Sequence, residues 1–230
     1  MTFVKDALSY KSLSIVGLDK NTGKTECLNY ILGKVKGTGK RVALTSIGID
    51  GESRDTVTHT AKPEIKIHPG MIFISAEKHY LQRRITSEIL DISNIRTSLG
   101  KLVVARALSN DKVLLSGPPD TQSLKALIGS MDNYGVNITI IDGALSRLSP
   151  ASPAVTEGMV LTTGAAHSAN MPELVRKTKY VVDLINLPQV EDALANELDS
   201  IQTGIYAVGS EGTLHNLNQS VFMLQKAKSV

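Results

Sequence analysis

Residues 17–25 read Gly-Leu-Asp-Lys-Asn-Thr-Gly-Lys-Thr and have the residue types of a loop that binds phosphate. Backbone N–H groups around 21–25 can surround a β-phosphate, helped by the positive end of a helix that follows. Lys24 can reach the β- and γ-phosphates, and the Thr25 hydroxyl can bind Mg²⁺. Gly23 lets the backbone approach the anion because it has no Cβ. The residues expected to bind a nucleotide are Asp19, Asn21, Thr22, Gly23, Lys24, Thr25 and Glu26.

The two glycines of this segment, which we name the phosphate loop (residues 17–25), have an unusual spacing. Five residues separate Gly17 from Gly23, whereas the usual phosphate-binding pattern has four. A Gly-Lys-Thr triplet occurs by chance in many proteins, so a merely structural turn is the alternative. The order of strand, glycine loop, Gly-Lys-Thr and helix favours a phosphate site.

A site that transfers phosphate also needs carboxylates that hold Mg²⁺. Asp142 comes at the end of the apolar run Ile-Thr-Ile-Ile, where an acid at the edge of a sheet can face a nucleotide. Asp50 follows a second predicted strand and can support Mg²⁺ or orient the attacking water, and nearby Glu52 could replace it. The expected metal ligands are therefore Thr25, Asp50 and Asp142. The alternatives are a turn aspartate at position 142 and a solvated loop carboxylate at position 50.

Other side chains give weaker chemical signals. Arg106 and Arg147 could stabilise charge on transferring phosphoryl oxygens, or could be ordinary surface residues. A zinc site is not expected, because no ligand spacing such as His-x-x-x-His links the histidines at positions 59, 68, 79, 167 and 215. Serine-hydrolase chemistry has no support either, since no Gly-x-Ser-x-Gly motif surrounds the serines at 46, 116 and 146.

Short apolar runs alternate with amphipathic segments along the chain, and this alternation predicts the fold. The expected strands are 12–17, 41–48, 101–108, 112–118, 137–144, 158–165 and 203–209. The expected helices are 25–37, 77–92, 121–135 and 171–187. We expect 65–76 to form a hairpin or a strand with a turn at Pro69 and Gly70, and 49–64 and 146–158 to form loops, the first of functional length.

This order of elements is typical of an α/β fold. We expect a three-layer α/β/α arrangement with a mostly parallel sheet, helices on both faces and the phosphate loop directly after the first strand. The rhythm of strands and helices resumes after the loop 146–158. The whole chain, 1–230, is therefore expected to form a single domain.

The composition narrows the classes of function. The chain of 230 residues is 42% hydrophobic and 20% charged, as in ordinary globular proteins. A net charge of +3 without a dense basic face argues against nucleic-acid binding. Cys27 is the single cysteine, which excludes an intrachain disulfide and a multi-cysteine metal site. With no signal peptide and no apolar run of transmembrane length, we expect a cytoplasmic protein without a membrane partner.

The phosphate loop resembles that of dethiobiotin synthetase and its relatives, Gly-Thr-Asp-Thr-x-Val-Gly-Lys-Thr, which has the same five-residue spacing and an aspartate at the place of Asp19. That class of P-loop proteins includes MinD-like ATPases and maturation GTPases for nickel enzymes. The resemblance implies a P-loop NTPase that binds Mg²⁺ and a nucleotide. ATP is preferred, because the Asn-Lys-x-Asp stretch that reads guanine in many GTP-specific members is absent.

Lys20 departs from the synthetase loop. It could be a second cation near the phosphates, similar to the extra lysine of MinD-like loops that reaches across a dimer. The alternative is a solvated loop lysine. Under the first interpretation, the expected catalytic residues are Lys24, Asp50 and Lys20.

A second resemblance covers more of the chain. Several segments are similar to the small P-loop subunit of the reactivating complex of bacterial lysine 5,6-aminomutase, an enzyme that uses adenosylcobalamin and pyridoxal phosphate. These segments are 13–32, 44–52, 114–120, 141–154 and 161–166. The resemblance implies an accessory ATPase that drives release of damaged cobalamin from the mutase. Its partners would be a second copy of the chain or a larger ATPase subunit, together with the aminomutase.

Two other functions stay open. A dethiobiotin synthetase-like ligase or kinase would act on a small molecule, although the Lys-Pro segment that follows the second strand in that family is not at the corresponding place. Here the single Lys-Pro pair, Lys62 and Pro63, comes later. A nucleotide-sensing module would bind the nucleotide without hydrolysing it.

Overall fold

The computed structural model describes residues 2–47, 65–144, 155–187, 192–199, 201, 204–209 and 212–218. The predicted loop 49–64 lies outside the described residues, and so do Asp50 and Glu52. Arg147 and most of the predicted loop 146–158 also lie outside them.

The chain divides into two compact units, Met1–Lys179 and Tyr180–Val230. The boundary falls inside helix α5 (Met171–Ile185). A single domain over 1–230 stays a prediction.

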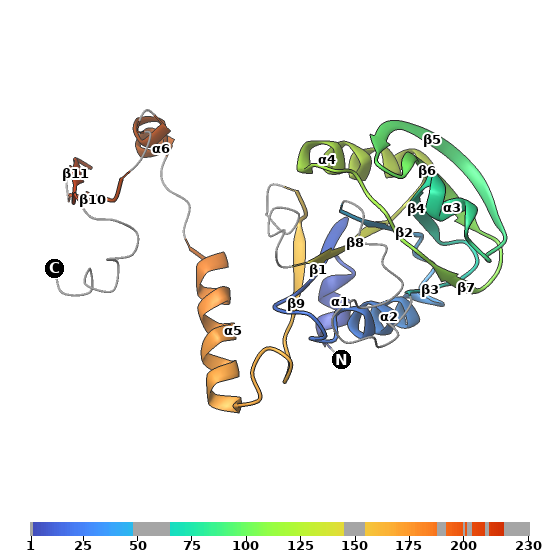
Figure 1. Cartoon of the computed structure of the whole chain (residues 1–230), viewed down its shortest axis with the longest axis horizontal. Helices are drawn as coiled ribbons and strands as arrows, with labels where there is room; N and C mark the ends of the chain where they lie inside the picture. Colours follow the sequence, from blue (N-terminus) through green and yellow to red (C-terminus); the bar gives the residue numbers. More distant parts are fainter. Residues whose placement is uncertain are drawn as a thin grey trace. The chain divides into compact units, whose positions relative to one another are not determined.

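The first unit is built around a large, mostly parallel sheet (Figure 1). Within the described residues this sheet has seven strands in the order β5, β6, β4, β2, β8, β1, β9. Strands β4, β2, β8, β1 and β9 run parallel, and β6 and β5 continue the sheet in antiparallel pairings. The strand bounds are β1 (Ser12–Gly17), β2 (Val42–Ser46), β4 (Ile72–Ala76), β5 (Ser87–Thr97), β6 (Gly100–Ala107), β8 (Ile138–Ala144) and β9 (Gly158–Thr162). The predicted fold class is confirmed.

Helices cover both faces of this sheet and give the three predicted layers. The helices of the first unit are α1 (Thr2–Ala7), α2 (Lys24–Val35), α3 (Glu77–Leu81), α4 (Thr121–Ser130), the 3₁₀ helix η1 (Met131–Tyr134) and the first part of α5. Helices α1 and α2 share one apolar core with Ile15, Leu44 and Ile140 of the sheet. Helix α4 and η1 share the other with Ala43 and Ile74.

The central strands form because their residues are apolar or small and are buried on both faces. All residues of β1 and β2 are buried, as expected for parallel strands between two helical layers. Helix α2 buries Leu28, Ile31 and Leu32 at helical spacing and is followed by Gly37, whose φ of 87° does not suit a helix. The predicted strand 12–17 and the predicted helix at 25–37 are therefore confirmed.

The predicted helix over 77–92 is wrong beyond its first turns. Helix α3 ends at Leu81, and the chain then enters the long strand β5. Ile89 and Ile92 are three residues apart, a spacing typical of helices, yet both line one groove beside α3. The register of β5 against β6 shifts between Ile89 and Asp91, which changes the side-chain alternation and produces this spacing within a strand.

Two other predicted segments differ from the structure. The hairpin interpretation of 65–76 is wrong, because β3 (Ile65–Ile67) pairs with β7 (Asp111–Val113) in a separate small sheet, while β4 joins the large one. Of the predicted strand 112–118, only the part within β7 is strand. The turn expected at Pro69 and Gly70 is present, with Met71 N–H bonded to the His68 carbonyl at 3.1 Å.

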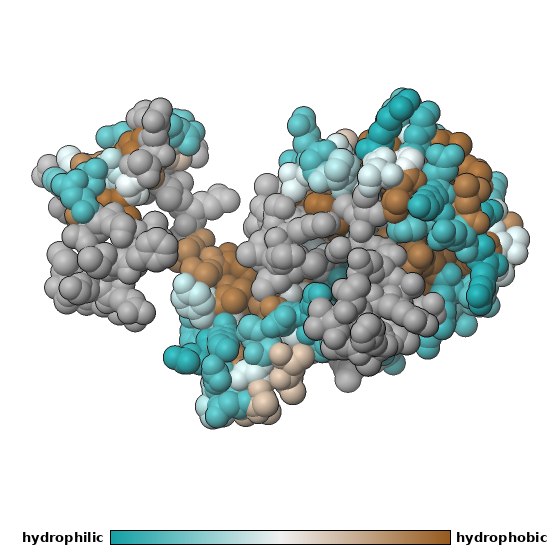
Figure 2. Space-filling model, viewed as in Figure 1, coloured by the Kyte–Doolittle hydropathy of each residue, from teal (hydrophilic) through white to brown (hydrophobic). Residues whose placement is uncertain are grey.

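The second unit contains the end of α5, helix α6 (Asp192–Asp199) and a two-stranded antiparallel sheet of β10 (Tyr206–Val208) and β11 (Leu214–Asn216). The predicted strand 203–209 therefore belongs to a small separate sheet. The carboxyl end of α5 and the residues directly after it carry exposed apolar side chains, visible as a brown patch in Figure 2. They are Val182, Leu184, Ile185 and Leu187.

Gly117 packs directly against the carboxyl end of β2. An added Cβ at this position would overlap the backbone oxygen of Ser46. We expect Gly117→Ala to lower the free energy of unfolding by about 3 kcal/mol, because backbone must move to accommodate it. Urea unfolding of the two proteins checks this.

The matched control is Gly33→Ala in the last turn of α2. A Cβ at Gly33 meets no atom within 4 Å, and alanine favours a helix interior by about 0.5–1 kcal/mol. This variant should unfold at slightly higher urea than the wild type. Equal midpoints for the two variants would contradict the assigned packing of Gly117.

Candidate functional site

The phosphate loop joins β1 to α2 at the carboxyl edge of the parallel strands. Strand β1 lies between β8 and β9, so the loop has a neighbour on each side. Asp142 is at the carboxyl end of β8 and pairs in register with Ile15 of β1 and Ser46 of β2. In parallel α/β sheets this edge is where ligands bind.

The unusual glycine spacing has a structural explanation. Leu18 is buried, and its N–H still donates to the Thr162 carbonyl at 2.9 Å, so strand pairing continues one residue beyond Gly17. The turn itself is confined to the residues between Leu18 and Lys24. Glycine is required at position 17, where the phosphate loop begins, because a Cβ there would lie 2.7 Å from the Thr22 hydroxyl oxygen.

Two residues of the turn adopt left-handed backbone conformations. Asn21 has a φ of 59° and Gly23 a φ of 85°. Gly23 is the N-cap of α2, and no side chain caps this end of the helix. The first helical bond runs from the Cys27 N–H to the Gly23 carbonyl at 2.9 Å, so the amides of the first turn have no partner within the helix. Such amides form an anion site at a helix N-terminus.

Lys24 and Asp142, both expected in the site, are brought into direct contact. Nζ of Lys24 lies 2.9 Å from Oδ1 of Asp142, and the two side chains are 24% and 18% exposed. The contact is an ion pair, but Oδ1 is fully buried and has no hydrogen-bond partner of acceptable geometry among the described residues. Opposite charges 2.9 Å apart attract each other even without a hydrogen bond between them, so the pair is attractive.

The residues present fit a Mg²⁺ ion. A buried carboxylate oxygen without a hydrogen bond is a ligand that a cation would satisfy, and carboxylate and hydroxyl oxygens are the donors that Mg²⁺ prefers. Thr25, half-buried at the second position of α2, supplies the hydroxyl. No group of three or more His, Cys, Asp or Glu side chains in the described part of the chain could hold a metal by itself. Mg²⁺ would therefore need phosphate oxygens and water as further ligands.

Asp19 shapes the first half of the turn. Its Oδ1 accepts from the Lys20 N–H at 2.7 Å, and its backbone oxygen accepts from the Thr22 hydroxyl at 2.8 Å. Its Oδ2 lies 3.4 Å from Nδ1 of His167. The Lys20 N–H, and after it the His167 imidazole, hold the pKa of the Asp19 carboxyl below its ordinary value.

The remaining predicted residues lie at the surface of the loop or elsewhere. Lys20 and Glu26 are exposed, Glu26 in the first turn of α2. The suggested role of Arg106 is wrong: its register partner Ile72 begins β4, so Arg106 lies toward the amino edge of the parallel strands. It pairs there with Glu88 at 3.1 Å.

Two residues beside the phosphate loop were missed from the sequence. Thr162 ends β9, and its hydroxyl lies 3.5 Å from that of Thr22 and donates to the Val16 carbonyl at 3.3 Å. His167 reaches Asp19 from the segment after β9. The only sequence signal for Thr162 is a threonine at the end of a predicted strand. No local pattern marks His167, because its partner is 148 residues away in the sequence.

Buried hydroxyls also line the carboxyl ends of the neighbouring strands. The Thr45 hydroxyl donates to the Ser46 carbonyl at 3.2 Å and to the Ser116 carbonyl at 3.4 Å, and the Ser46 hydroxyl donates to the Asp142 carbonyl at 3.0 Å. Nδ1 of His79 lies 2.8 Å from Oγ of Ser116. Burial, and after it the charge of Lys78, lower the pKa of the His79 imidazole.

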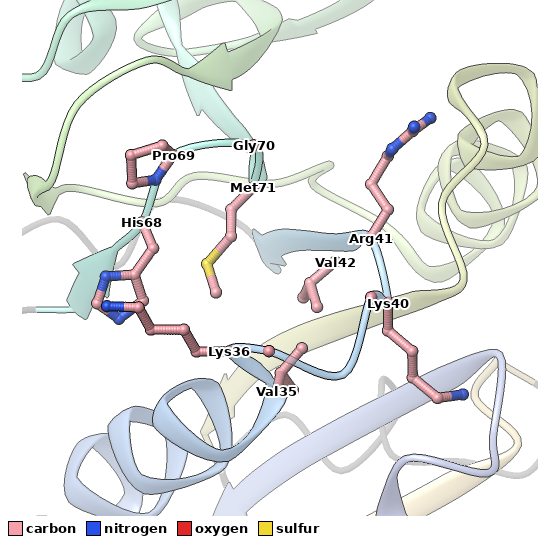
Figure 3. Close-up of a pocket in the computed structure, with 11 residues that line it drawn as sticks. Val35, Lys36, Lys40, Arg41, Val42, His68, Pro69, Gly70 and Met71 are labelled. Carbon is pink, nitrogen blue, oxygen red and sulfur yellow. The ribbon is translucent and has the colours of Figure 1, made fainter.

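A separate cavity of about 380 Å³ lies at the opposite edge, where α2 ends and β2 and β4 begin (Figure 3). Lysine and arginine side chains surround it, but the Lys40 ammonium donates to the Leu8 carbonyl at 3.0 Å and the Arg41 guanidinium to the Tyr134 carbonyl at 2.6 Å. Figure 3 shows both side chains directed away from Met71 at the centre. The charges of Lys40 and Arg41 are therefore engaged elsewhere, whereas the side chain of Lys36, which also lines the cavity, extends toward His68 (Figure 3).

No family model matches the chain, and the searches of curated proteins and of solved structures found no match. Among the helices that the structure describes, none has the length and apolar character needed to span a membrane.

The ion pair of Lys24 and Asp142 can be measured in a double-mutant cycle. With Lys24→Met, Asp142→Asn and the double variant, we expect a coupling of about 1–2 kcal/mol in the free energy of unfolding, because the pair is largely buried. Urea unfolding without nucleotide gives the four values.

The exposed pair of Arg106 and Glu88 is the control, with side chains 35% and 52% exposed at 3.1 Å. Its cycle of Arg106→Met and Glu88→Gln should give a coupling below about 1 kcal/mol. The assignment fails if the two cycles give the same coupling.

Proposed function

We propose that this protein is a P-loop NTPase that binds Mg-ATP at the phosphate loop. The observation that carries the proposal is the contact of Lys24 with Asp142 beside an uncapped helix N-terminus. A cation, unpartnered amides and a buried carboxylate therefore lie at one edge of the sheet. These are the three components that a Mg-nucleoside triphosphate needs from a protein.

Each component has a separate task in this proposal. The first-turn amides of α2 bind the β-phosphate, since they point along the helix axis toward an anion. Lys24 moves from Asp142 to the β- and γ-phosphates, where its charge stabilises the transferring phosphoryl group. Thr25 and Asp142 would hold Mg²⁺, which would supply positive charge beside the phosphate oxygens.

The charges of Lys24 and Asp142 explain why Lys24 would leave Asp142 when a nucleotide binds. Asp142 needs a cation because its Oδ1 is buried, and its carboxylate would hold Mg²⁺ once Lys24 has turned to the phosphates. Binding of the metal and of the phosphates is therefore expected to be cooperative. Asp50 completes the proposed metal set, and Lys20 is retained as a proposed second cation on the sequence grounds given above.

The physiological role is a narrower proposal. The similarity of five segments to the small subunit of the lysine 5,6-aminomutase reactivating complex supports an accessory ATPase that works with a second copy or a larger ATPase subunit on a cobalamin-dependent aminomutase. A ligase or kinase for a small molecule is the alternative. Slow ATP hydrolysis that a partner protein stimulates would support the accessory ATPase. Turnover that requires a small acceptor molecule would support the ligase or kinase.

Lys24→Ala is expected to weaken binding of Mg-ATP by about 10- to 100-fold, because charge-assisted hydrogen bonds to phosphate are lost. Isothermal titration calorimetry measures the dissociation constant, and phosphate release measures hydrolysis. Thr25→Val and Asp142→Asn should instead reduce the dependence of binding on Mg²⁺.

Lys34→Ala is the matched control on the same helix. Lys34 lies in the last turn of α2, with its ammonium 5.5 Å from the centre of the Tyr30 ring, so its loss should leave the dissociation constant unchanged. The proposal is refuted if wild type does not bind Mg-ATP, or if Lys24→Ala and Lys34→Ala bind it equally well.

A further inference from the structure

The segment after β9 runs alongside the phosphate loop. We name residues 162–168 the β9 strap. The carbonyl of its first residue, Thr162, accepts a hydrogen bond from the Leu18 N–H at 2.9 Å. Gly164 lies close to the loop as well, since a Cβ built on it would be 3.9 Å from the backbone of Thr22. The strap then turns, with the His167 N–H bonded to the Gly164 carbonyl at 2.8 Å. It therefore contacts the phosphate loop over several residues.

The strap contacts both ends of the strained part of the loop. Asn21 is a non-glycine residue in the left-handed region, a conformation that costs about 1 kcal/mol or more and persists only when neighbours hold it. On one side of Asn21, Thr22 is near the Thr162 hydroxyl. On the other side, Asp19 is near the His167 imidazole, whose side chain is only 20% exposed.

We infer that His167 is a positioning residue of the phosphate loop: through Asp19 it keeps the turn in the shape that presents the first-turn amides of α2 to phosphate. The described contact of the His167 imidazole is with the Asp19 carboxylate. Its action is therefore on the conformation of the loop, and the nucleotide senses it indirectly.

The strength of this contact depends on pH. The pair carries opposite charges only when the imidazole is protonated, and a protonated imidazole attracts a carboxylate more strongly than a neutral one does. The lowered pKa of the Asp19 carboxyl keeps this partner ionised. The contact therefore strengthens as the pH falls.

The other charged groups at this contact come from the loop and from α5. Lys177 of α5 also acts on Asp19, and its ammonium is paired with Glu173 at 3.0 Å. Glu173 in turn accepts from the Ser168 hydroxyl at 3.0 Å. Lys20 is the neighbour of Asp19 in sequence. None of these named neighbours is an imidazole, so the pH dependence of the contact is assigned to His167.

The first measurement is amide hydrogen exchange of residues 18–23 in the full-length protein without nucleotide. Relative to wild type, His167→Asn should exchange about threefold faster at about pH 8 and about tenfold faster at about pH 5.5, since a charge-assisted contact is lost at low pH. In the Asp19→Asn background, where the charged partner of His167 is absent, the exchange of the double variant relative to Asp19→Asn alone should not vary with pH. A ratio that is the same at both pH values, or equal to one, overturns the inference.

The second measurement uses magnesium tripolyphosphate as the probe. The ratio of the dissociation constants of His167→Asn and wild type should rise as the pH falls, and protonation of the probe cancels in this ratio. This part rests on the proposed function. If wild type does not bind the probe, the proposed function fails, while hydrogen exchange still decides the role of His167.

The matched control is His68→Asn. His68 lies at the amino edge of β4 and contacts the Asn110 side chain at 2.9 Å, so its replacement should change neither measurement. Circular dichroism melts of all variants show whether they remain folded. Equal effects of His68→Asn and His167→Asn on exchange of the loop would also overturn the inference.

Discussion

The parallel register of β9, β1, β8 and β2 is the constraint on which the candidate site depends. It places Gly17 beside Thr162, and Asp142 beside both β1 and β2. A shift of β8 by one residue against β1 would turn Asp142 to the opposite face of the sheet and separate it from Lys24. The register is maintained by apolar side chains packed on both faces. The polar site is therefore a consequence of hydrophobic packing at some distance from it.

The loop shows how such a sheet can hold a strained turn in one shape. Left-handed Asn21 is unfavourable in isolation, but hydrogen bonds from Thr22 and Lys20 to Asp19 stabilise the turn locally. The contacts from the β9 strap add support from a distant part of the chain. A site whose amides are already oriented loses less conformational entropy when an anion binds. Rigidity of the loop and affinity for phosphate are thus physically linked.

Local patterns were sufficient to predict part of this structure. The buried run before Gly17, the Gly-Lys-Thr triplet and the acid near the end of β8 each depend on a few adjacent residues. The sequence therefore indicated β1, α2, β8 and the positions of Lys24 and Asp142. The sequence did not indicate β5, because a register shift gave Ile89 and Ile92 helical spacing. It could not indicate His167 either, since this contact exists only after β9 has paired with β1.

The irregular pairing of β5 has a consequence for the outer edge of the sheet. An edge strand with free backbone groups invites strands of other molecules to join it. Here the register is interrupted between Ile89 and Asp91 and again between Ile92 and Arg96, and the exposed side chains include charges of both signs. An incoming strand could form only a few consecutive ladder bonds before it lost alignment. Interrupted register and exposed charges are features by which edge strands disfavour pairing with strands of other molecules.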